Sequence, residues 1–287
     1  VYDEDDNLLD YHFESFDATN ETAVIWVYRD WVRDGSTQAK IAYGSGPSDQ
    51  SVAASTVFDK ESNLVAGYLL NETSGYALDV TSNNNDGTVY GATQGVDGIV
   101  GGAYDFDGND DYVDLGFAFL GTMIISCWFK TSDSSSNMTV IGNTKSNPYY
   151  IREIGFTDGG YEVTTYDYNN GSNGFYSGNN PYPVDIWTHY VAGFEDNGDG
   201  TATYYIYENG SLVDSMTDDY VETDNYPFYV GAYNKRGSPD RFYQGLLDSL
   251  RIYNIVPTED EISALYATTK SSPDFFSQQK IVASTNS

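Results

Sequence analysis

Short runs of β-branched and aromatic residues, each closed by a turn, constrain the fold of this chain more than any other feature. Side chains alternate with a period of two in Tyr204-Tyr205-Ile206-Tyr207 and in Leu250-Arg251-Ile252-Tyr253, as β-strands require. Asn209-Gly210 follows the first run, and an Asn-Gly pair favours a type I′ hairpin. Such runs recur at the close spacing of a sandwich or barrel. The sequence therefore predicts an all-β fold.

One helix is expected near the C-terminus. Thr258-Glu259-Asp260-Glu261 forms a capping box, in which the Thr258 hydroxyl and the Glu261 carboxylate satisfy each other's backbone N–H groups. Ile262, Leu265 and Tyr266 follow at helical spacing, so one face of this helix can pack on the sheet. Residues 270–287 are rich in Ser, Thr and Gln and indicate a tail or linker.

The charge balance excludes one class of partner. The chain has 43 Asp and Glu against 13 Lys and Arg, a net charge of −30. Nucleic-acid binding needs clustered cations, so it is excluded. The repulsion between so many like charges nearly vanishes at about 1 M salt, where the Debye length is roughly 3 Å. The composition therefore fits a halophilic protein, haloarchaeal or from a haloarchaeal virus, with an ordinary acidic extracellular protein as the alternative.

Membrane insertion and disulfide bonds are not expected of this sequence. Its longest apolar stretches, such as Met123-Ile124-Ile125, are far too short to span a bilayer. Cys127 is the single cysteine, which excludes a disulfide framework and a cysteine-ligated metal. The chain begins at Val1 without a leader or a starting Met, so we expect it to be a piece of a longer protein.

Seven landmarks in order make residues 64–269 resemble the LamG-like (laminin G-like), concanavalin A-like jelly-roll family. Each landmark is weak alone, but together they span some two hundred residues. The resemblance implies a sandwich of two antiparallel sheets with a short C-terminal helix. The landmarks are Leu64–Leu70, Ala77–Thr88, Ala103–Val113 with its Phe106-Asp107-Gly108 turn, Ile125–Lys130, Trp187–Ala192, Tyr207–Gly210 and Gln244–Asn254 with the capped helix.

The first residues resemble the closing part of an uncharacterised β-domain that often precedes LamG-like modules in large archaeal and bacterial surface proteins. This resemblance rests on Leu9–Glu14, Ala23–Val27, Ile41–Gly44 and Val57–Asp59. We therefore divide the chain into the C-terminal part of a small β-domain (1–62), a jelly-roll domain (63–269) and a tail or linker (270–287).

The jelly-roll resemblance also implies a structural calcium ion. Many members of the family tie the Asp/Asn loop to the last strand with calcium, and the matching positions here are Asp79, Asn85 and Asp248. Calcium takes oxygens from carboxylates, amides and loop carbonyls. The alternative is a solvated turn of Asn and Asp residues. A second acidic stretch, Glu195–Gly200, lacks the downstream Glu of an EF-hand, so we interpret it as a hairpin turn.

Catalysis is not expected, although the fold also includes glucanases. Those enzymes use a Glu-x-Asp-x-Glu strand, and this sequence has none. Of the two histidines, His12 and His189, the second falls on a strand whose counterpart in the family packs structurally. Serine nucleophile elbows, phosphate loops and zinc motifs are also missing from the sequence.

A patch rich in Tyr and Asn is the candidate ligand-binding surface. Aromatic rings suit the C–H faces of sugars, and amides and acids suit their hydroxyl groups. Strand aromatics with polar turns are the equally weighted alternative. The candidate residues are Tyr149, Tyr150, Tyr166, Tyr168, Asn173 and Tyr176.

Five glycosylation sequons favour an extracellular protein, at the surface of a cell or a virion. A glycan at Asn170 would argue against binding at the patch, and we expect Asn209, in a tight hairpin, to be the least modified. The sequons begin at Asn20, Asn71, Asn137, Asn170 and Asn209.

Together these features predict a non-enzymatic recognition module. We expect it to bind surface glycans or a glycosylated surface protein, within an adhesin or a viral spike or tail-fibre protein. We also expect a homo-oligomer or larger assembly, whose many copies would multiply weak single-site affinity. The alternatives are a structural spacer or decorating subunit of a virion, filament or surface layer and, less favoured, a glycoside hydrolase.

Overall fold

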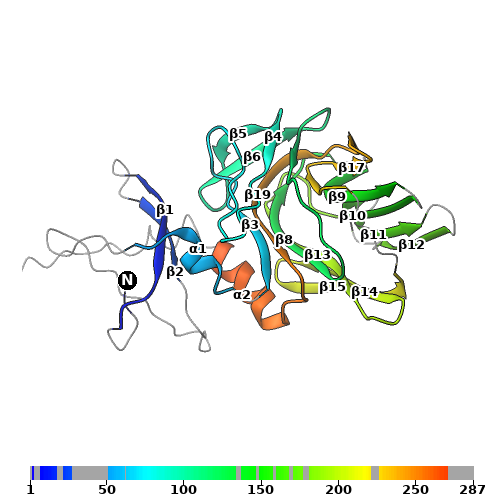
Figure 1. Cartoon of the computed structure of the whole chain (residues 1–287). Helices are drawn as coiled ribbons and strands as arrows, with labels where there is room; N and C mark the ends of the chain where they lie inside the picture. Colours follow the sequence, from blue (N-terminus) through cyan, green and yellow to red (C-terminus); the bar gives the residue numbers. More distant parts are fainter. Residues whose placement is uncertain are drawn as a thin grey trace, which may run out of the picture.

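The computed structural model describes residues 2, 7–17, 22–27, 51–61, 63–133, 137–146, 149–157, 160–167, 171–176, 181–220 and 226–270. Most of them form two stacked antiparallel sheets (Figure 1), which confirms the predicted jelly-roll sandwich. A separate hairpin pairs β1 (Tyr11–Asp17) with β2 (Thr22–Val27), and the short helix α1 (Ala54–Phe58) follows it. In the described residues no helix is long and apolar enough to cross a membrane.

The first sheet has nine strands. Their order along the main path, with bounds, is β12 (Gly171–Tyr176), β11 (Gly160–Asp167), β10 (Tyr149–Thr157), β9 (Met138–Ser146), β16 (Tyr229–Val230), β7 (Tyr112–Asp114) and β4 (Thr88–Tyr90), with β17 (Tyr233–Lys235) and β18 (Ser238–Asp240) attached as a hairpin next to β9.

The second sheet has eight strands. Their order is β15 (Ser211–Asp219), β14 (Thr201–Glu208), β13 (Thr188–Asp196), β8 (Met123–Lys130), β19 (Gln244–Tyr253), β6 (Gly102–Asp107) and β5 (Thr93–Asp97), with β3 (Leu64–Tyr68) paired to β19.

The hydrophobic core lies between the two sheets. Alternate residues of β8, among them Ile125, Cys127 and Phe129, point into it and are buried. Ile124, Ser126 and Trp128, on the other face of β8, are buried too, and α2 (Glu259–Lys270) packs on this outer face of the eight-stranded sheet. Ile262 of this helix packs with Ile124 and Val191 in a second apolar cluster. The central strand is therefore buried on both faces.

Two local predictions are confirmed in detail. Asn209 and Gly210 both have positive φ, 51° and 79°, and turn β14 into β15 as a type I′ hairpin requires. At the start of α2, the Thr258 hydroxyl accepts the Glu261 N–H at 3.2 Å, and the Glu261 carboxylate accepts the Thr258 N–H at 2.8 Å. The capping box fixes where the helix begins.

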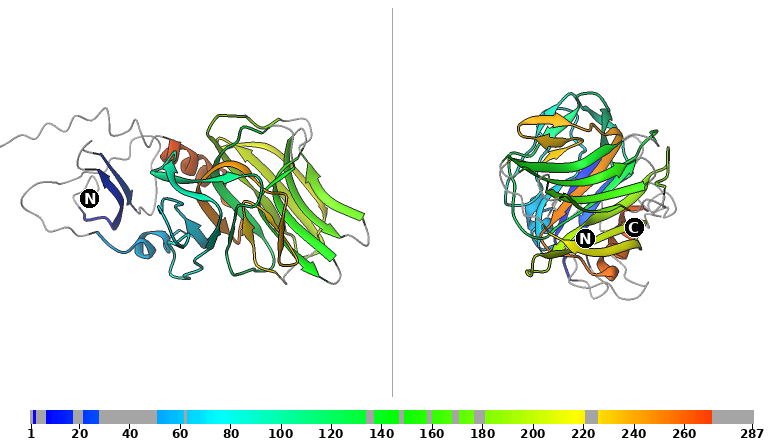
Figure 2. Two further views of the ribbon diagram at one scale, coloured as in Figure 1. Left: turned by 90° about the horizontal axis from the view of Figure 1, so that it is seen from above. Right: turned by 90° about the vertical axis from the view of Figure 1, so that its right-hand side faces the viewer.

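The N-terminal hairpin and α1 pack against the eight-stranded sheet, at the end of the molecule away from β9–β12 (Figure 2). Arg251 of β19 is buried at this junction, with its guanidinium 5.0 Å from the Trp26 ring centre and 5.7 Å from that of Phe58. Its Nε atom is 3.4 Å from a Glu61 carboxylate oxygen, without hydrogen-bond geometry. The Trp26 and Phe58 rings also contact each other, so the junction is held by an arginine packed over two neighbouring aromatic rings.

Candidate functional site

The two outer faces of the sandwich differ in what covers them. Helix α2 packs on the outer face of the eight-stranded sheet, and the N-terminal hairpin and α1 contact this sheet near β3 and β19. His189 is 2% exposed on this face, in contact with the rings of Trp128 and Tyr266, and its ring is 2.9 Å from the Ser126 hydroxyl. Burial and the nearby Arg251 lower its pKa to about 3. His189 is therefore a buried structural residue, as interpreted from the sequence.

The outer face of the nine-stranded sheet carries a row of three tyrosines whose rings contact one another. Tyr90, Tyr112 and Tyr229 come from the neighbouring strands β4, β7 and β16, on the face opposite the core residues Val113 and Val230. Their adjacent ring centres are 4.6 Å apart, and Tyr90 at the end of the row is 45% exposed. We call these three residues the tyrosine row.

Acidic and polar groups lie close to the tyrosine row. Asp114 pairs in register with Tyr229, and burial with the Asp114 charge raises the pKa of Tyr229 to about 12. Thr88, the register partner of Asp114, is exposed.

A buried acidic pair lies farther across the same sheet. Glu153 of β10 and Glu162 of β11 are each 2% exposed and lie on the outer face. The Arg241 guanidinium donates to both, with Nη1 2.8 Å from Glu153 Oε2 and 3.5 Å from Glu162 Oε2. The Thr139 hydroxyl donates to the other oxygen of Glu153. Burial raises the pKa of Glu153, against the opposing effect of Arg241 and Thr139.

The acidic pair was not predicted from the sequence. Alternation in β10 and β11 places both glutamates on the face opposite the core residues Ile154 and Val163. Solvent-exposed glutamates lie on that face of a strand as well, so the pattern does not distinguish a buried pair from an exposed one. Arg241, the cation that joins them, is 88 residues from Glu153 and 79 from Glu162. No local pattern signals such a contact.

The predicted ligand patch falls on β10, β11 and β12 of this sheet. The register pairs Tyr150 with Asp167, Tyr166 with Ser172 and Ile151, and Asn173 with Thr165. Tyr149 opens β10 and Tyr176 closes β12. These backbone positions lie together at the edge of the sheet that ends in β12, while Tyr168 lies outside the described residues.

The structure brings two of the three predicted calcium ligands together. Asp79 and Asn85 lie in one loop, where Asp79 Oδ2 accepts the Asn85 N–H at 2.9 Å. The Asp79 carboxylate also accepts the N–H groups of Gly67 and Thr81, at 3.0 Å each, and the Thr81 hydroxyl. Its lone pairs are therefore already engaged by donors.

Asp248 serves a different loop. It is fully buried, and its Oδ2 accepts the N–H groups of Ile99 and Val100 at 2.7 and 2.8 Å, while the Ser249 hydroxyl donates to Oδ1. Burial raises its pKa to about 7, against these hydrogen bonds. In the described residues no contact joins Asp248 to Asp79. Asp79 accepts hydrogen bonds on both oxygens and Asp248 accepts those of a separate loop, so the structure does not bring the three residues to one ion, and calcium stays a prediction.

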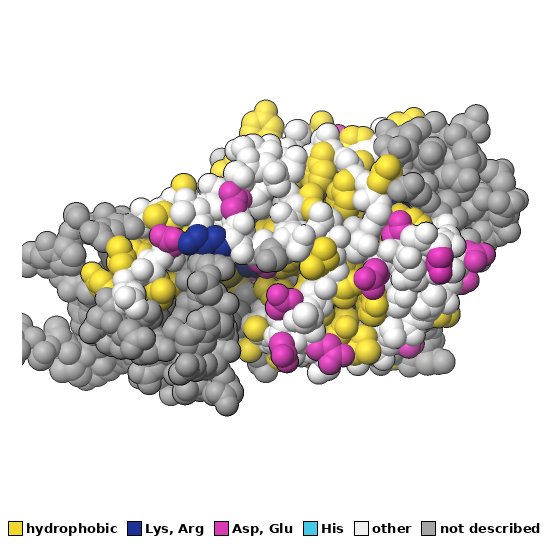
Figure 3. Space-filling view, turned by 60° about the horizontal axis from the view of Figure 1, so that its bottom comes forward, with side chains coloured by type: hydrophobic (Ala, Val, Ile, Leu, Met, Phe, Trp, Pro, Cys, Tyr) yellow, Lys and Arg dark blue, Asp and Glu magenta, His cyan; other side chains and the backbone are white. Residues whose placement is uncertain are grey.

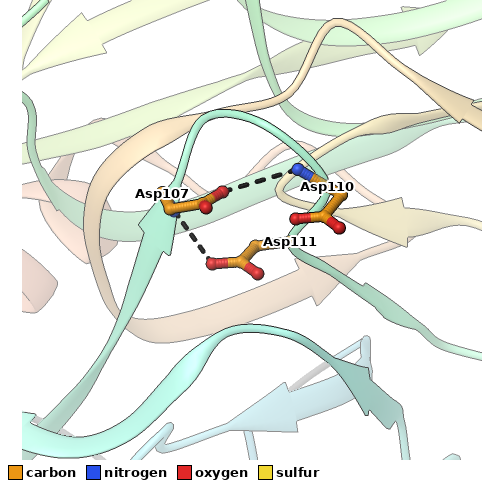
Figure 4. A group of neighbouring side chains, drawn as sticks. All are labelled: Asp107, Asp110 and Asp111. Carbon is orange, nitrogen blue, oxygen red and sulfur yellow. Dashed lines mark hydrogen bonds between the residues drawn. The ribbon is translucent and has the colours of Figure 1, made fainter.

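The described residues contain one compact acidic group, Asp107, Asp110 and Asp111 between β6 and β7 (Figure 4). Its carboxylates accept backbone N–H groups of the same turn: Asp107 those of Asn109 and Asp110, Asp111 that of Asp107. These hydrogen bonds all lie within the turn and stabilise it, and they do not indicate a ligand.

Three of the sequons lie in described residues. Asn137 is exposed and accepts the Thr157 hydroxyl, and Asn71 is half-buried. Asn209 accepts the His189 N–H with its side chain at 3.1 Å. Asn20 and Asn170 lie outside the described residues. Glycosylation at all five positions stays a prediction.

Charged side chains are distributed unevenly over the surface. On the face drawn in Figure 3 the acidic side chains are scattered over several elements, whereas Lys and Arg gather at one place. A cavity of about 220 Å³ opens between the chain after β19 and α2, and its lining includes Ile255, Pro257 and Leu265. Its mostly apolar walls make it a poor site for a sugar.

Several solved structures have a similar fold. Domain 4 of AbnA, an extracellular GH43 arabinanase from Geobacillus stearothermophilus, was solved with arabinotriose. It is 23% identical, with a TM-score of 0.56, and the match covers 71% of this chain and 98% of that one. The binding domain of Paraclostridial Mosquitocidal Protein 1 is 19% identical, with a TM-score of 0.54, and the match covers 72% of this chain and 52% of that one.

A third structure belongs to botulinum neurotoxin type C, whose cell entry depends on interaction with two ganglioside molecules. It is 13% identical, with a TM-score of 0.52, and the match covers 72% of this chain and 51% of that one. Identities this low show a shared fold and nothing more. No curated protein matches the chain.

Two family models match the sequence. A domain of unknown function, DUF2341, matches residues 1–85. Laminin_G_3, described as the concanavalin A-like lectin/glucanases superfamily, matches residues 107–263, more than half of the chain. The chain therefore belongs to the Laminin_G_3 family of the concanavalin A-like lectin/glucanases superfamily.

Proposed function

We propose that this chain is a non-enzymatic recognition module that binds glycans with the outer face of its nine-stranded sheet. The tyrosine row is the observation that carries the proposal. Aromatic faces carry a negative quadrupole that attracts the C–H groups of a sugar ring, and a phenol or carboxylate beside them can bond its hydroxyls. Tyr90 offers an accessible ring, and Asp114 supplies the carboxylate.

The similar structures support a carbohydrate ligand. One was solved with arabinotriose, and the toxin relative interacts with gangliosides. The predicted patch from Tyr149 to Tyr176 lies on β10–β12 of the same sheet, so it would extend the binding surface toward that edge. The finer roles remain proposals: an adhesin or a viral spike or tail fibre, displayed in many copies at an extracellular surface.

The acidic pair argues for binding rather than hydrolysis. A glycosidase needs two carboxyl groups about 5–9.5 Å apart with the glycosidic bond between them. Here the Arg241 guanidinium lies between Glu153 and Glu162 and donates to both. The cation occupies the position that a substrate would need.

A glycan panel tests the proposal. Immobilised arabinan, xylan, mannan and β-glucan oligosaccharides would be probed in about 2 M salt, where the Debye length is only a few Å and charge repulsion is screened. We expect selective binding by the parent. An aromatic contact contributes about 0.5–1.5 kcal/mol, so Tyr90→Ala should weaken binding about three- to tenfold.

Tyr76→Ala is the matched control, because Tyr76 is an equally accessible tyrosine, 60% exposed, outside the tyrosine row. It should leave the affinity unchanged. Equal losses in both variants would show that the row is not the binding surface. A folded parent that binds no glycan would overturn the proposal and favour the structural spacer or decorating subunit.

A further inference from the structure

The cavity beside α2 combines apolar walls with two carboxylates, those of Glu61 and Glu261. We propose that this cavity binds an arginine side chain of a partner protein, with the aliphatic stem against the apolar walls and the guanidinium at the carboxylates. The inference goes beyond glycan binding, because α2 packs on the eight-stranded sheet and the tyrosine row lies on the other one.

Three segments far apart in the sequence form the cavity. Glu61 lies just after α1, Ile255 follows β19, and Leu265 belongs to α2. Both helices lie at the end of the jelly roll nearer the N-terminal hairpin (Figures 1 and 2). Tyr253, at the end of β19, donates its hydroxyl to the Glu61 carboxylate. This hydrogen bond holds one of the two carboxylates at the cavity wall.

The size of the cavity indicates what it can hold. Sites for drug-sized ligands have volumes of roughly 300–1,000 Å³. This cavity has about 220 Å³, which leaves room for one long side chain but not for an oligosaccharide. Its walls include Ile255, Pro257 and Leu265, and apolar surface of this kind favours contact with hydrocarbon.

The two carboxylates favour a cationic side chain. Glu61 is 28% exposed, and its Oε2 atom is 3.4 Å from Arg251 Nε, so its charge is partly balanced. Glu261 is exposed, and its Oε2 atom accepts the N–H and the hydroxyl of Thr258. Among the described residues no lysine or arginine pairs with Glu261, and none lines the cavity. The negative charge of Glu261 is therefore available to a cation from outside.

The start of α2 does not neutralise this charge. Glu259 and Asp260 lie beside Glu261 in the first turn of the helix. Three carboxylates exceed the roughly half a positive charge of a helix N-terminus. A second copy of this chain, with a net charge of −30, would be repelled. The partner is therefore a different protein, with a basic surface.

Arginine fits these features better than lysine. Its guanidinium is planar, carries five N–H donors and is more weakly hydrated than an ammonium group, so it can bond to two carboxylates beside an apolar wall. Its aliphatic stem packs along apolar surface while the charged head stays near water. The stem would lie against Leu265 and Ala264, and the head between Glu61 and Glu261.

Titration with two matched peptides, followed by NMR, tests the proposal. The probes are acetylated and amidated Gly-Leu-Arg-Leu-Gly and the same peptide with citrulline, a neutral isostere of arginine, at its centre. In about 0.5 M salt the Debye length is only a few Å, so general attraction to the acidic surface is screened. Hydrogen bonds to charged groups are stronger than neutral ones, so the parent should bind the arginine peptide at least about fivefold more tightly.

Glu261→Gln removes one charge from the cavity and should remove most of this preference. Glutamine also fits the third position of a capping box, so α2 should still form. Glu259→Gln is the matched control, because it removes the same charge from the same turn of α2 although Glu259 does not line the cavity. This control should keep the preference for arginine.

Ala264→Leu fills the cavity without changing its charge. Ala264 belongs to the wall formed by α2, and the larger side chain would occupy the space of the arginine stem. Leucine is a good helix former, so the unfolding midpoint should not fall. Binding of both peptides should be lost.

Failure to bind either peptide, or equal binding of the two by the parent, would overturn the proposal. An Ala264→Leu variant that still binds the arginine peptide would overturn it too. Equal losses of preference in Glu261→Gln and Glu259→Gln would show attraction to the acidic surface in place of a cavity site. None of these results bears on glycan binding, and Tyr90→Ala should leave peptide binding unchanged, because the tyrosine row lies on the other sheet.

Discussion

Replacing Asp248 by asparagine should stabilise the protein at neutral and alkaline pH. Asp248 is fully buried on β19, and its ordinary pKa of 3.8 is raised to about 7 by burial. The amide side chain of the variant would keep an oxygen for the N–H groups of Ile99 and Val100, and its NH₂ group would donate to the Ser249 hydroxyl. The substitution therefore removes the charge while preserving the number of hydrogen bonds.

The magnitude follows from linkage. A group whose pKa is raised by folding stabilises the protein fully below its unfolded pKa, and this contribution is lost as the pH rises through the folded pKa. From 3.8 to about 7 the shift is roughly three units, and one unit corresponds to about 1.4 kcal/mol. The Asp248→Asn variant should thus be more stable than the parent by about 4 kcal/mol at about pH 8, with no difference below about pH 3.8.

Urea unfolding of both proteins at several pH values, with chelator and constant salt, measures this difference. Asp214→Asn on the exposed strand β15 is the control, and it should change stability by less than about 0.5 kcal/mol. A variant less stable than the parent at about pH 8 would refute the reasoning, because the carboxylate would then be stabilised in its charged form. If that loss occurred only with calcium present, it would identify Asp248 as a ligand of the ion.

Three further results are expected. Arg251→Met should lower stability by about 2–3 kcal/mol, since two ring contacts and a partly exposed ion pair are lost. A double-mutant cycle with Trp26→Leu that shows no coupling energy would contradict the contact between Arg251 and the Trp26 ring. The lowered pKa of His189 means that stability is full above about pH 6.5 and falls by about 1.4 kcal/mol per unit toward the folded pKa of about 3. His189→Gln should remove that slope in urea unfolding, and an unchanged slope would contradict the assignment. Calcium added to protein freed of metal by a chelator should leave the unfolding midpoint unchanged. If a calcium site were present, free calcium at 100 times its Kd would raise the free energy of unfolding by about 2.7 kcal/mol. A rise in the midpoint would therefore support the calcium prediction.

The fold could be predicted because its signals are local. Asn209-Gly210 specifies its own backbone conformation, and Thr258 with Glu261 specifies a helix start within four residues. The order of the landmarks then selects the jelly roll, which the Laminin_G_3 match confirms. The halophilic character, the identity of the N-terminal domain and the domain boundaries stay predictions.

The candidate site could be predicted only in part. The aromatic strands β10–β12 were identified, but Glu153 acquires its role from Arg241, brought to it by strands that pair out of chain order. The calcium prediction met the same difficulty. Asp248 matches a family position, yet its neighbours are the N–H groups of a loop nearly 150 residues earlier in the chain. Tertiary partners, not residue type, decide what a buried carboxylate does.

The position of α2 and the N-terminal hairpin has a consequence for display. Both pack on the eight-stranded sheet, so the segments that flank the jelly roll in sequence approach it from one side. Repeated copies joined through these segments would each be attached on the side of the eight-stranded sheet. The tyrosine row, on the other sheet, would then face away from the attachment in every copy. The distance between neighbouring copies, more than the rotation of any one copy, would then determine how many sugars the array of copies binds at once.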